Sequence, residues 1–324
     1  MKVEASGSAA RMVQVIADFK ADLLALGRRA FSAVWGSQVQ QIPDHEILMR
    51  HLDSLRRRPA IRPRRLLVAD DFRCPPAEES GWQLLQRKIV NGNDLTPHLS
   101  DGHIKFDNWD GLLNEWGVHH LHLGTTLSAK HPVLIERTVP VLFSRITPDT
   151  FYAINIYPHG QWENSAIIES LHRNWPDSIR RHRLNGVKGE PLSDLQRRNI
   201  RRLNVQAATA VVDTTVYGAI DGGVSSGGIS FDAVRTTDML LVDVQNLQMS
   251  IQEQFDKFIP HLTAAGYKDE PEVRAVLAGI TPEGFEVHFP DYGTRFNVTL
   301  EGGWFHGTQP GSISRGFIGA PPRK

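Results

Sequence analysis

The sequence has little of what would tie a protein to a membrane or to an oxidising compartment. Cys74 is the single cysteine among 324 residues, so no disulfide can form within the chain, and a reducing compartment is the natural expectation. No stretch approaches the roughly 18 apolar residues that a spanning helix needs, and the first residues lack the apolar core of a signal peptide. We therefore expect a cytoplasmic protein that does not associate with membranes.

An excess of charge of one sign is also missing, because 36 lysines and arginines balance 36 aspartates and glutamates. Net charge thus gives no argument for nucleic-acid binding. The arginines are unevenly spread, however: seven lie between Arg50 and Arg65, and a second group spans Arg173 to Arg202. Such runs are usually solvated, but Arg also offers phosphate a planar fork of donors. In the first run, the residues expected on the surface are Arg56, Arg57, Arg58, Arg62, Arg64 and Arg65.

The pattern of apolar residues predicts an α+β protein. Apolar residues recur at helical spacing over 9–35 and again after Asp44, and Leu66 to Val68 is typical of a short strand. The glycine-rich stretch Gly222–Gly228 lacks the Lys-Ser/Thr ending of a P-loop, so we interpret it as a hinge or turn. The predicted divisions are a helical N-terminal segment (1–72), a central α+β domain whose antiparallel sheet carries helices on one face (73–185), a second small α+β domain (186–301) and a flexible tail (302–324).

One long amphipathic helix is expected over residues 237–258. Its apolar residues from Leu240 to Phe258 step by three and four positions, which is the spacing of a packed helix face. The same stripe is typical of a helix that binds a protein partner or a second copy of the chain. A core helix and a homodimer helix are therefore both open.

The stretch Asn108–Gly124 contains three histidines within four residues. Asn108 is predicted to be the N-cap of a short helix, and Gly117 is typical of the left-handed residue that ends one. The β-prone residues that follow predict a strand over 118–124. Because side chains alternate along a strand, His120 and His122 should share one face, and His119 should share the other with Leu121 and Leu123.

These histidines allow three interpretations. They can be structural residues, or they can transfer protons, because the ordinary pKa of histidine lies near neutrality. His-x-His on a strand is also a spacing that metal sites use, but such a site needs further ligands. Candidates for the additional ligand are Asp110, Glu115, His159 and His172.

The residues after the cluster predict a β-hairpin over 133–157, with a turn at 147–150. The block from Val118 to His159 resembles the strand core of RelE/ParE-type bacterial toxins. The similar features are the polar strand VHHLHL, a strand led by Arg137, the turn with Pro148-Asp149, and a strand that ends at His159. The resemblance covers about 80 residues, roughly within 78–180, and implies helices that precede an antiparallel sheet.

The resemblance also implies cleavage of RNA without a metal or other cofactor. That reaction needs a base for the 2′-hydroxyl, an acid for the leaving oxygen and a cation for the phosphate. We expect His120 and His122 to serve as base and acid, Arg137 to neutralise the phosphate, and His159 to be an acid or a substrate anchor. Residues expected to contact the substrate are His119, Tyr157 and Arg173.

Two other functions remain open from the sequence. One is a metal-dependent enzyme with a His-x-His site. The other is a non-enzymatic module that binds nucleic acid or protein through its basic segments and its long apolar helix. Convergence of His120, His122, Arg137 and His159 on one pocket would favour the RNA-cleaving enzyme.

Overall fold

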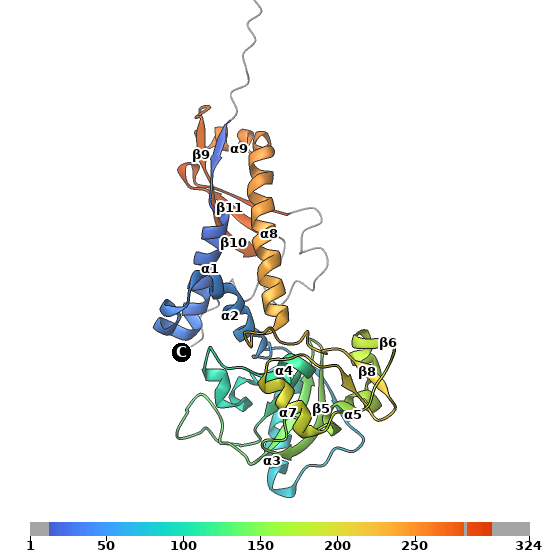
Figure 1. Ribbon diagram of the computed structural model, residues 1–324. Coiled ribbons are helices and arrows are strands. Elements are labelled where there is room, and N and C mark those ends of the chain that lie inside the picture. Colours follow the sequence, from blue (N-terminus) through green and yellow to red (C-terminus); the bar gives the residue numbers. More distant parts are fainter. Residues whose placement is uncertain (1–12, 282–283, 300–324) are drawn as a thin grey trace, which may run out of the picture. The chain divides into compact units, whose positions relative to one another are not determined.

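The computed structural model describes residues 13–281 and 284–299 and confirms the α+β class (Figure 1). The chain forms two compact units, one from Met1–Leu52 with Arg235–Lys324 and the other from Asp53–Val234. The first unit appears in blue and orange in Figure 1, because it is built from two segments far apart in the sequence. The boundaries thus differ from those expected after residues 72 and 185. The expected tail, 302–324, lies outside the described residues.

The unit Asp53–Val234 is built on a four-stranded sheet with the order β2-β5-β4-β3. β3 (Val118–Leu121), β4 (Pro140–Ile146) and β5 (Thr150–Pro158) are antiparallel neighbours, as the sequence predicts. β2 (Arg65–Val68) adds to the sheet in parallel with β5. A register shift between β4 and β5 leaves Ile154 as an extra residue, which is a β-bulge.

Helices cover both faces of this sheet, whereas the sequence led us to expect them on one face only. α3 (Glu79–Asn91) packs against one face, in the same apolar cluster as Leu142 of β4. α4 (Gly111–Trp116) and α5 (Ala166–Asn174) pack against the other face, in the same cluster as Val141. Successive strand residues point to opposite faces, so each interior strand supplies both clusters.

A smaller sheet completes this unit. β6 (Arg183–Lys188), β7 (Thr209–Ala210) and β8 (Thr215–Tyr217) pair antiparallel in the order β6-β8-β7. α6 (Pro176–Ile179) precedes β6, and α7 (Asp194–Arg202) lies between β6 and β7. The segment after β7 adds buried residues to the cluster of α4 and α5, namely Val211, Tyr217 and Ile220.

The other unit combines helices with two small sheets. Its helices and strands are β1 (Gln14–Ile16), α1 (Phe19–Trp35), α2 (Asp44–Arg56), α8 (Phe231–Glu253), α9 (Ile259–Ala264), β9 (Glu272–Arg274), β10 (Val276–Thr281), β11 (Gly284–Phe289) and β12 (Thr294–Val298). β1 pairs in parallel with β9, and β10, β11 and β12 form an antiparallel meander. α2 and α8 run across the two boundaries between the units. In the described part of the chain, every helix falls short of the length and apolarity that a bilayer crossing requires.

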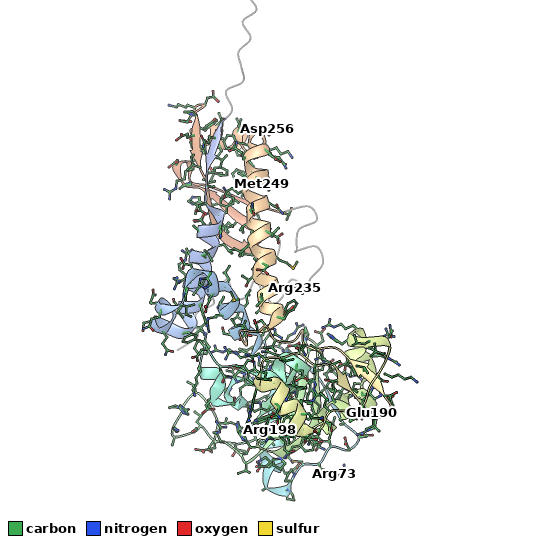
Figure 2. All side chains as sticks on the ribbon, viewed as in Figure 1. Arg73, Glu190, Arg198, Arg235, Met249 and Asp256 are labelled. Carbon is green, nitrogen blue, oxygen red and sulfur yellow. The ribbon has the colours of Figure 1, made fainter. Side chains whose placement is uncertain are left out.

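Several predicted elements begin or end elsewhere. Residues 9–12 of the helix expected over 9–35 lie outside the described part of the chain. From residue 13 onward this helix begins only at Phe19, because Asp18 caps it and the strand β1 before it pairs with β9. The helix expected over 237–258 is α8, which begins at Phe231 and ends at Glu253. On α8, Met249 is 50% exposed and labelled in Figure 2.

Three predictions near the histidines also need correction. Asp110, not Asn108, caps α4, since its side chain accepts a hydrogen bond from the backbone of Leu113. The strand expected over 118–124 ends at Leu121, and the one expected over 133–146 begins at Pro140. Gly117 does end α4 in the left-handed conformation, as predicted.

The first arginine run does not lie wholly on the surface. Arg62 and Arg65 are exposed and Arg56 and Arg58 are half-buried, but Arg57 and Arg64 are buried. Arg57 donates hydrogen bonds to the backbone carbonyls of Lys105 and Phe106, and Arg64 donates to that of Thr147. Part of this run therefore fastens loops within its unit and is not available to a phosphate chain.

Candidate functional site

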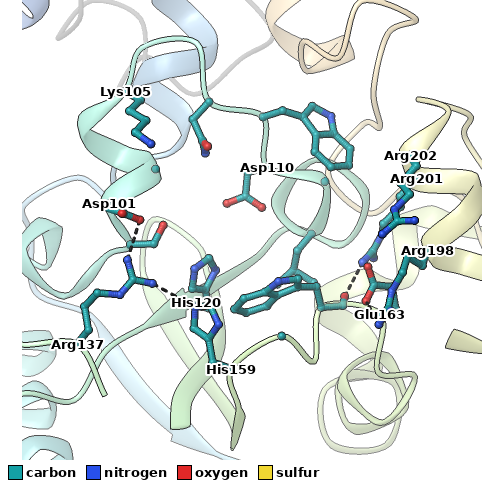
Figure 3. Close-up of a pocket in the computed structure, with 18 residues that line it drawn as sticks. Asp101, Lys105, Asp110, His120, Arg137, His159, Glu163, Arg198, Arg201 and Arg202 are labelled. Carbon is teal, nitrogen blue, oxygen red and sulfur yellow. Dashed lines mark hydrogen bonds and ion pairs between the residues drawn. The ribbon is translucent and has the colours of Figure 1, made fainter. Parts of the chain in front are cut away.

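The candidate site is a pocket of about 500 Å³ in the unit Asp53–Val234 (Figure 3). His120, Arg137 and His159 line it, so the structure brings together three of the four residues expected to be catalytic. They come from β3, from the segment before β4 and from the residue after β5. Adjacent antiparallel strands thus deliver residues that lie up to 39 positions apart in the sequence to one place.

His120 forms the partly buried wall of the pocket. Its ring packs on Trp162, with the ring centres 4.5 Å apart, and meets the ring of His159 edge-on at 6.5 Å. Burial lowers the pKa of His120 to about 4, with smaller contributions from the nearby His159 and Arg137. The imidazole is therefore neutral at pH 7 and able to accept a proton.

His159 and Arg137 form a hydrogen-bonded pair at the exposed side of the pocket. Nη2 of Arg137 donates to Nε2 of His159 at 3.2 Å, and Nη1 of Arg137 pairs with Asp101 at 2.7 Å. Because Nε2 accepts, the proton of the neutral His159 ring lies on Nδ1. Burial and the charge of Arg137 lower the pKa of His159. Asp101 thus orients the guanidinium, and the guanidinium orients the imidazole.

His122, the fourth residue expected to be catalytic, lies behind this pair. It does not line the pocket and is only 2% exposed, but its ring stacks on that of His159 with a centre distance of 6.0 Å. The backbone N–H of Thr138 donates to its Nδ1 at 3.2 Å. Burial lowers the pKa of His122 to about 4. His122 therefore supports His159 and does not face the open space.

The residues expected to contact a substrate lie outside the pocket. His119 is buried and its pKa is lowered well below the ordinary value by burial. Tyr157 packs edge-on against Phe143, 5.7 Å between ring centres. Arg173 pairs with Asp70 at 2.8 Å on the surface. None of these three side chains is among the described residues that form the pocket wall.

The opposite wall is cationic and was not identified from the sequence as part of the site. Figure 3 shows Arg198, Arg201 and Arg202 together on the side away from Arg137. All three belong to α7, which begins with a capping box in which Ser193 and Gln196 bond reciprocally. A helical turn is 3.6 residues long, so Arg198 and Arg202 share one face. Their spacing is visible in the sequence, but the direction of that face is not.

Glu115 explains how α7 is oriented. This buried carboxylate, on α4, forms ion pairs with Arg197 and with Arg201, the latter at 2.5 Å. Both guanidinium groups also lie over the ring of Trp116, 4.9 and 4.5 Å from its centre. With Arg197 and Arg201 held inward, the exposed Arg198 and Arg202 follow the other face.

The pocket has more positive than negative charge. Five of the described lining residues are lysine or arginine and three are aspartate or glutamate. Arg198 pairs with Glu163 at 3.5 Å, whereas the side chains of Lys105 and Arg202 form no hydrogen bond or ion pair with any residue in the described ranges. Arg202 is therefore available to an anionic ligand, and so is Lys105, which otherwise acts only through its charge on Asp101.

A protein metal site needs several ligand side chains close together. Within residues 13–281 and 284–299, no three histidine, cysteine, aspartate or glutamate side chains are grouped so that they can hold a metal ion. The pocket residues can instead move protons through two imidazoles and hold an anion on guanidinium and ammonium groups.

Known proteins add nothing to this geometry. No protein-family model, curated protein or solved structure matches the chain.

Proposed function

We propose that the pocket is the active site of a ribonuclease that cleaves RNA without a metal ion. The observation that carries this proposal is the meeting of His120, His159 and Arg137 in a pocket with surplus positive charge. In this reaction the 2′-hydroxyl of the RNA attacks the neighbouring phosphate. The reaction requires two groups that transfer protons and a cation that stabilises the phosphate.

The roles follow from burial and hydrogen bonding. His120, the more buried and neutral imidazole, takes the proton of the 2′-hydroxyl as this oxygen attacks phosphorus. The bond from phosphorus to the 5′-oxygen breaks, and His159 gives that oxygen its proton. The products are a 2′,3′-cyclic phosphate and a 5′-hydroxyl. Arg137 stabilises the charge that develops on the phosphate oxygens, as such donors do in other phosphoryl transfers.

His159 must be protonated before it can act as the acid. The approaching phosphate favours this protonation, because a nearby negative charge raises the pKa of an imidazole. His159 is exposed and His120 is partly buried, so the phosphate can reach His159 at a lower desolvation cost. Arg137 then turns from Nε2 of His159 to the phosphate, which frees Nε2 for the second proton.

His122 acts as a positioning residue in this proposal. Its stacked ring and its hydrogen bond to Thr138 restrict the orientation of His159. Accordingly, we expect a His122→Phe variant, which retains a stacking ring, to keep more activity than His122→Ala.

The first test is cleavage of a labelled ribo-oligonucleotide in the presence of EDTA. We expect the wild type to give the cyclic phosphate and to leave the same strand uncut when every ribose is 2′-O-methylated. His120→Ala and His159→Ala should each lower the rate about 100- to 10,000-fold, the usual contribution of a general acid or base. His45→Ala, which removes an exposed histidine of α2, is the matched control and should cleave at the wild-type rate.

Three results would contradict the proposal. These are no cleavage by the folded wild type, an unchanged rate in both histidine variants, and an activity that EDTA removes and one divalent metal restores. Thermal melting of each variant separates lost chemistry from lost folding.

A role as a bacterial toxin or in defence, which the RelE/ParE-like pattern suggests, remains a prediction. Induced expression in a bacterial host tests it, because the wild type should arrest growth and His120→Ala should not.

A further inference from the structure

Trp109 is an aromatic side chain that the proposed reaction does not use. It lines the pocket, and 40% of its surface is exposed. Single exposed apolar side chains are common and need no explanation. Trp109 is different because its surroundings keep it in the pocket wall.

Two glycines make room for this ring. A Cβ atom at Gly111 would lie 2.4 Å from Cη2 of Trp109, and one at Gly228 would lie 3.2 Å from its Cδ1. The indole therefore rests against backbone at two positions that are distant in sequence. A ring fixed in this way loses little further freedom when a ligand covers its exposed part.

The other tryptophan of the pocket is already engaged. Trp162 packs on His120 and His159, at 4.5 and 4.8 Å between ring centres, and on Phe143 at 5.6 Å. Trp109 is thus the pocket's available aromatic surface among the described residues. It lines the same pocket as Lys105 and Arg202, whose side chains form no hydrogen bond or ion pair with the described residues. The charge of Lys105 acts on Asp101 only as one of several nearby charges.

We propose that Trp109 stacks on an unpaired base and that the substrate of this site is single-stranded RNA; this inference rests on the proposed ribonuclease function. A base in a duplex is already stacked on both faces, whereas an unpaired base offers a face to an aromatic side chain. An aromatic platform and cations in one pocket are the combination that holds a single strand by base and backbone together. The adjacent phosphate then lies within the cationic wall, and the histidines flank it.

Binding can be measured without cleavage. The probe is a fluorescein-labelled 2′-O-methyl oligoadenylate, which lacks the attacking hydroxyl, used alone and annealed to 2′-O-methyl oligouridylate. Anisotropy titrations with the full-length protein compare the wild type, Trp109→Ala, Trp109→Phe and Phe231→Ala. Phe231 is 52% exposed and does not line the pocket, so its variant controls for loss of an exposed aromatic ring.

We expect Trp109→Ala to weaken single-strand binding roughly 5- to 150-fold, the range that loss of one stacked base gives. Trp109→Phe should lose less, Phe231→Ala should bind as the wild type does, and the duplex should bind more weakly than the single strand. Wild-type affinity in Trp109→Ala, equal binding of duplex and single strand, or no binding to either would overturn the inference. A melting curve for each variant shows that it is folded.

The two proposals fail separately in this design. A wild type that binds the single strand through Trp109 and yet cleaves no ribo-oligonucleotide contradicts the ribonuclease proposal, but not the proposal that Trp109 stacks on a base. If the wild type cleaves RNA and Trp109→Ala binds the single strand as well as the wild type does, the stacking proposal is contradicted. The ribonuclease proposal then stands.

Discussion

Individual buried histidines should make the stability of the unit Asp53–Val234 depend on pH. Burial lowers the pKa values of His98, His103, His120 and His122 to about 4 each. His98 shows how one of these neutral rings is used: Lys88 lies 3.0 Å from its Nε2, and its Nδ1 lies 2.9 Å from the carbonyl of His122. Since an ammonium group only donates, Nε2 must accept and Nδ1 carries the proton.

These shifts predict that stability falls as the pH falls. The ordinary pKa of histidine is about 6.5 and the folded value is about 4. Between these two pH values, these histidines bind protons in the unfolded chain but not in the folded chain. The free energy of unfolding therefore decreases from pH 6.5 down to pH 4, and these histidines add no further loss below that. Urea unfolding at half-unit steps of pH measures the slope.

His103→Leu tests one contributor to that slope. His103 is 3% exposed, and burial is the largest cause of its lowered pKa. Removing one such histidine should lower the slope by up to about 1.4 kcal/mol per pH unit, the effect of one proton. His45→Leu, at an exposed site, is the control. An identical slope in His103→Leu and the wild type would show that His103 titrates alike in both states.

The alternation of side chains along a strand predicts the positions of some residues of the site but not of others. It predicts that His120 and His122 point the same way, and both rings do reach His159. It could not show that His122 would be covered, because that depends on the Thr138 segment folding back over it. The sequence also provides no sign that Trp109 would line the pocket, because this residue lies before the start of α4 and its position depends on the loop.

At the level of elements, buried ion pairs join the helices α4 and α7. The Glu115 carboxylate on α4 holds Arg197 and Arg201 on α7, and Arg201 also donates to the carbonyl of Trp162. One carboxylate thus sets the position of the helix that lines the pocket and of the tryptophan beside His120. Its removal should affect stability and the site together.

Glu115→Ala should lower the free energy of unfolding by about 3–5 kcal/mol, because it leaves buried guanidinium groups without their counter-charge. The exposed Glu190 gives the matched control, and Glu190→Ala should change stability by less than about 0.5 kcal/mol. Urea unfolding at pH 7 compares the two. A loss below 1 kcal/mol in Glu115→Ala would mean that water, not Glu115, compensates these arginines.

Local signals predicted helix ends better than long-range pairing. Gly117 ends α4 in the left-handed conformation, as predicted. The same local rules apply elsewhere, because Gly92 ends α3 in that conformation and Ser193 caps α7. The helix expected over 9–35 was wrong over residues 13–18, where β1 pairs with β9 and Asp18 caps α1. A partner strand so distant in the sequence leaves no trace in local periodicity.

For the whole molecule, the division into units predicts which fragment folds. Asp53–Val234 contains the four-stranded sheet, both of its apolar clusters and all residues of the pocket. We expect this fragment to melt cooperatively and to keep the pocket. The shorter fragment 73–185, the domain expected from the sequence, lacks β2, both arginine partners of Glu115 and the buried Val211 and Ile220.

Circular dichroism and thermal melting of the two purified fragments test this prediction. Cooperative unfolding of Asp53–Val234 beside an unfolded or aggregated 73–185 is the expected pair of results. A cooperative transition in 73–185 would show that the second small sheet and α7 are dispensable for the core.

The other unit has a consequence for the order of events on the ribosome. Its first strand and helix are synthesised early, but their partners come late: the amide of Leu277 donates to Asp22, 255 positions before it. At ordinary translation rates that interval lasts roughly 10–50 s. Throughout it α1, whose buried residues include Phe19 and Leu23, lacks its native contacts with β10, while Asp53–Val234 can already fold. The emerging protein should therefore engage chaperones through its first helix, and release should await the last strands.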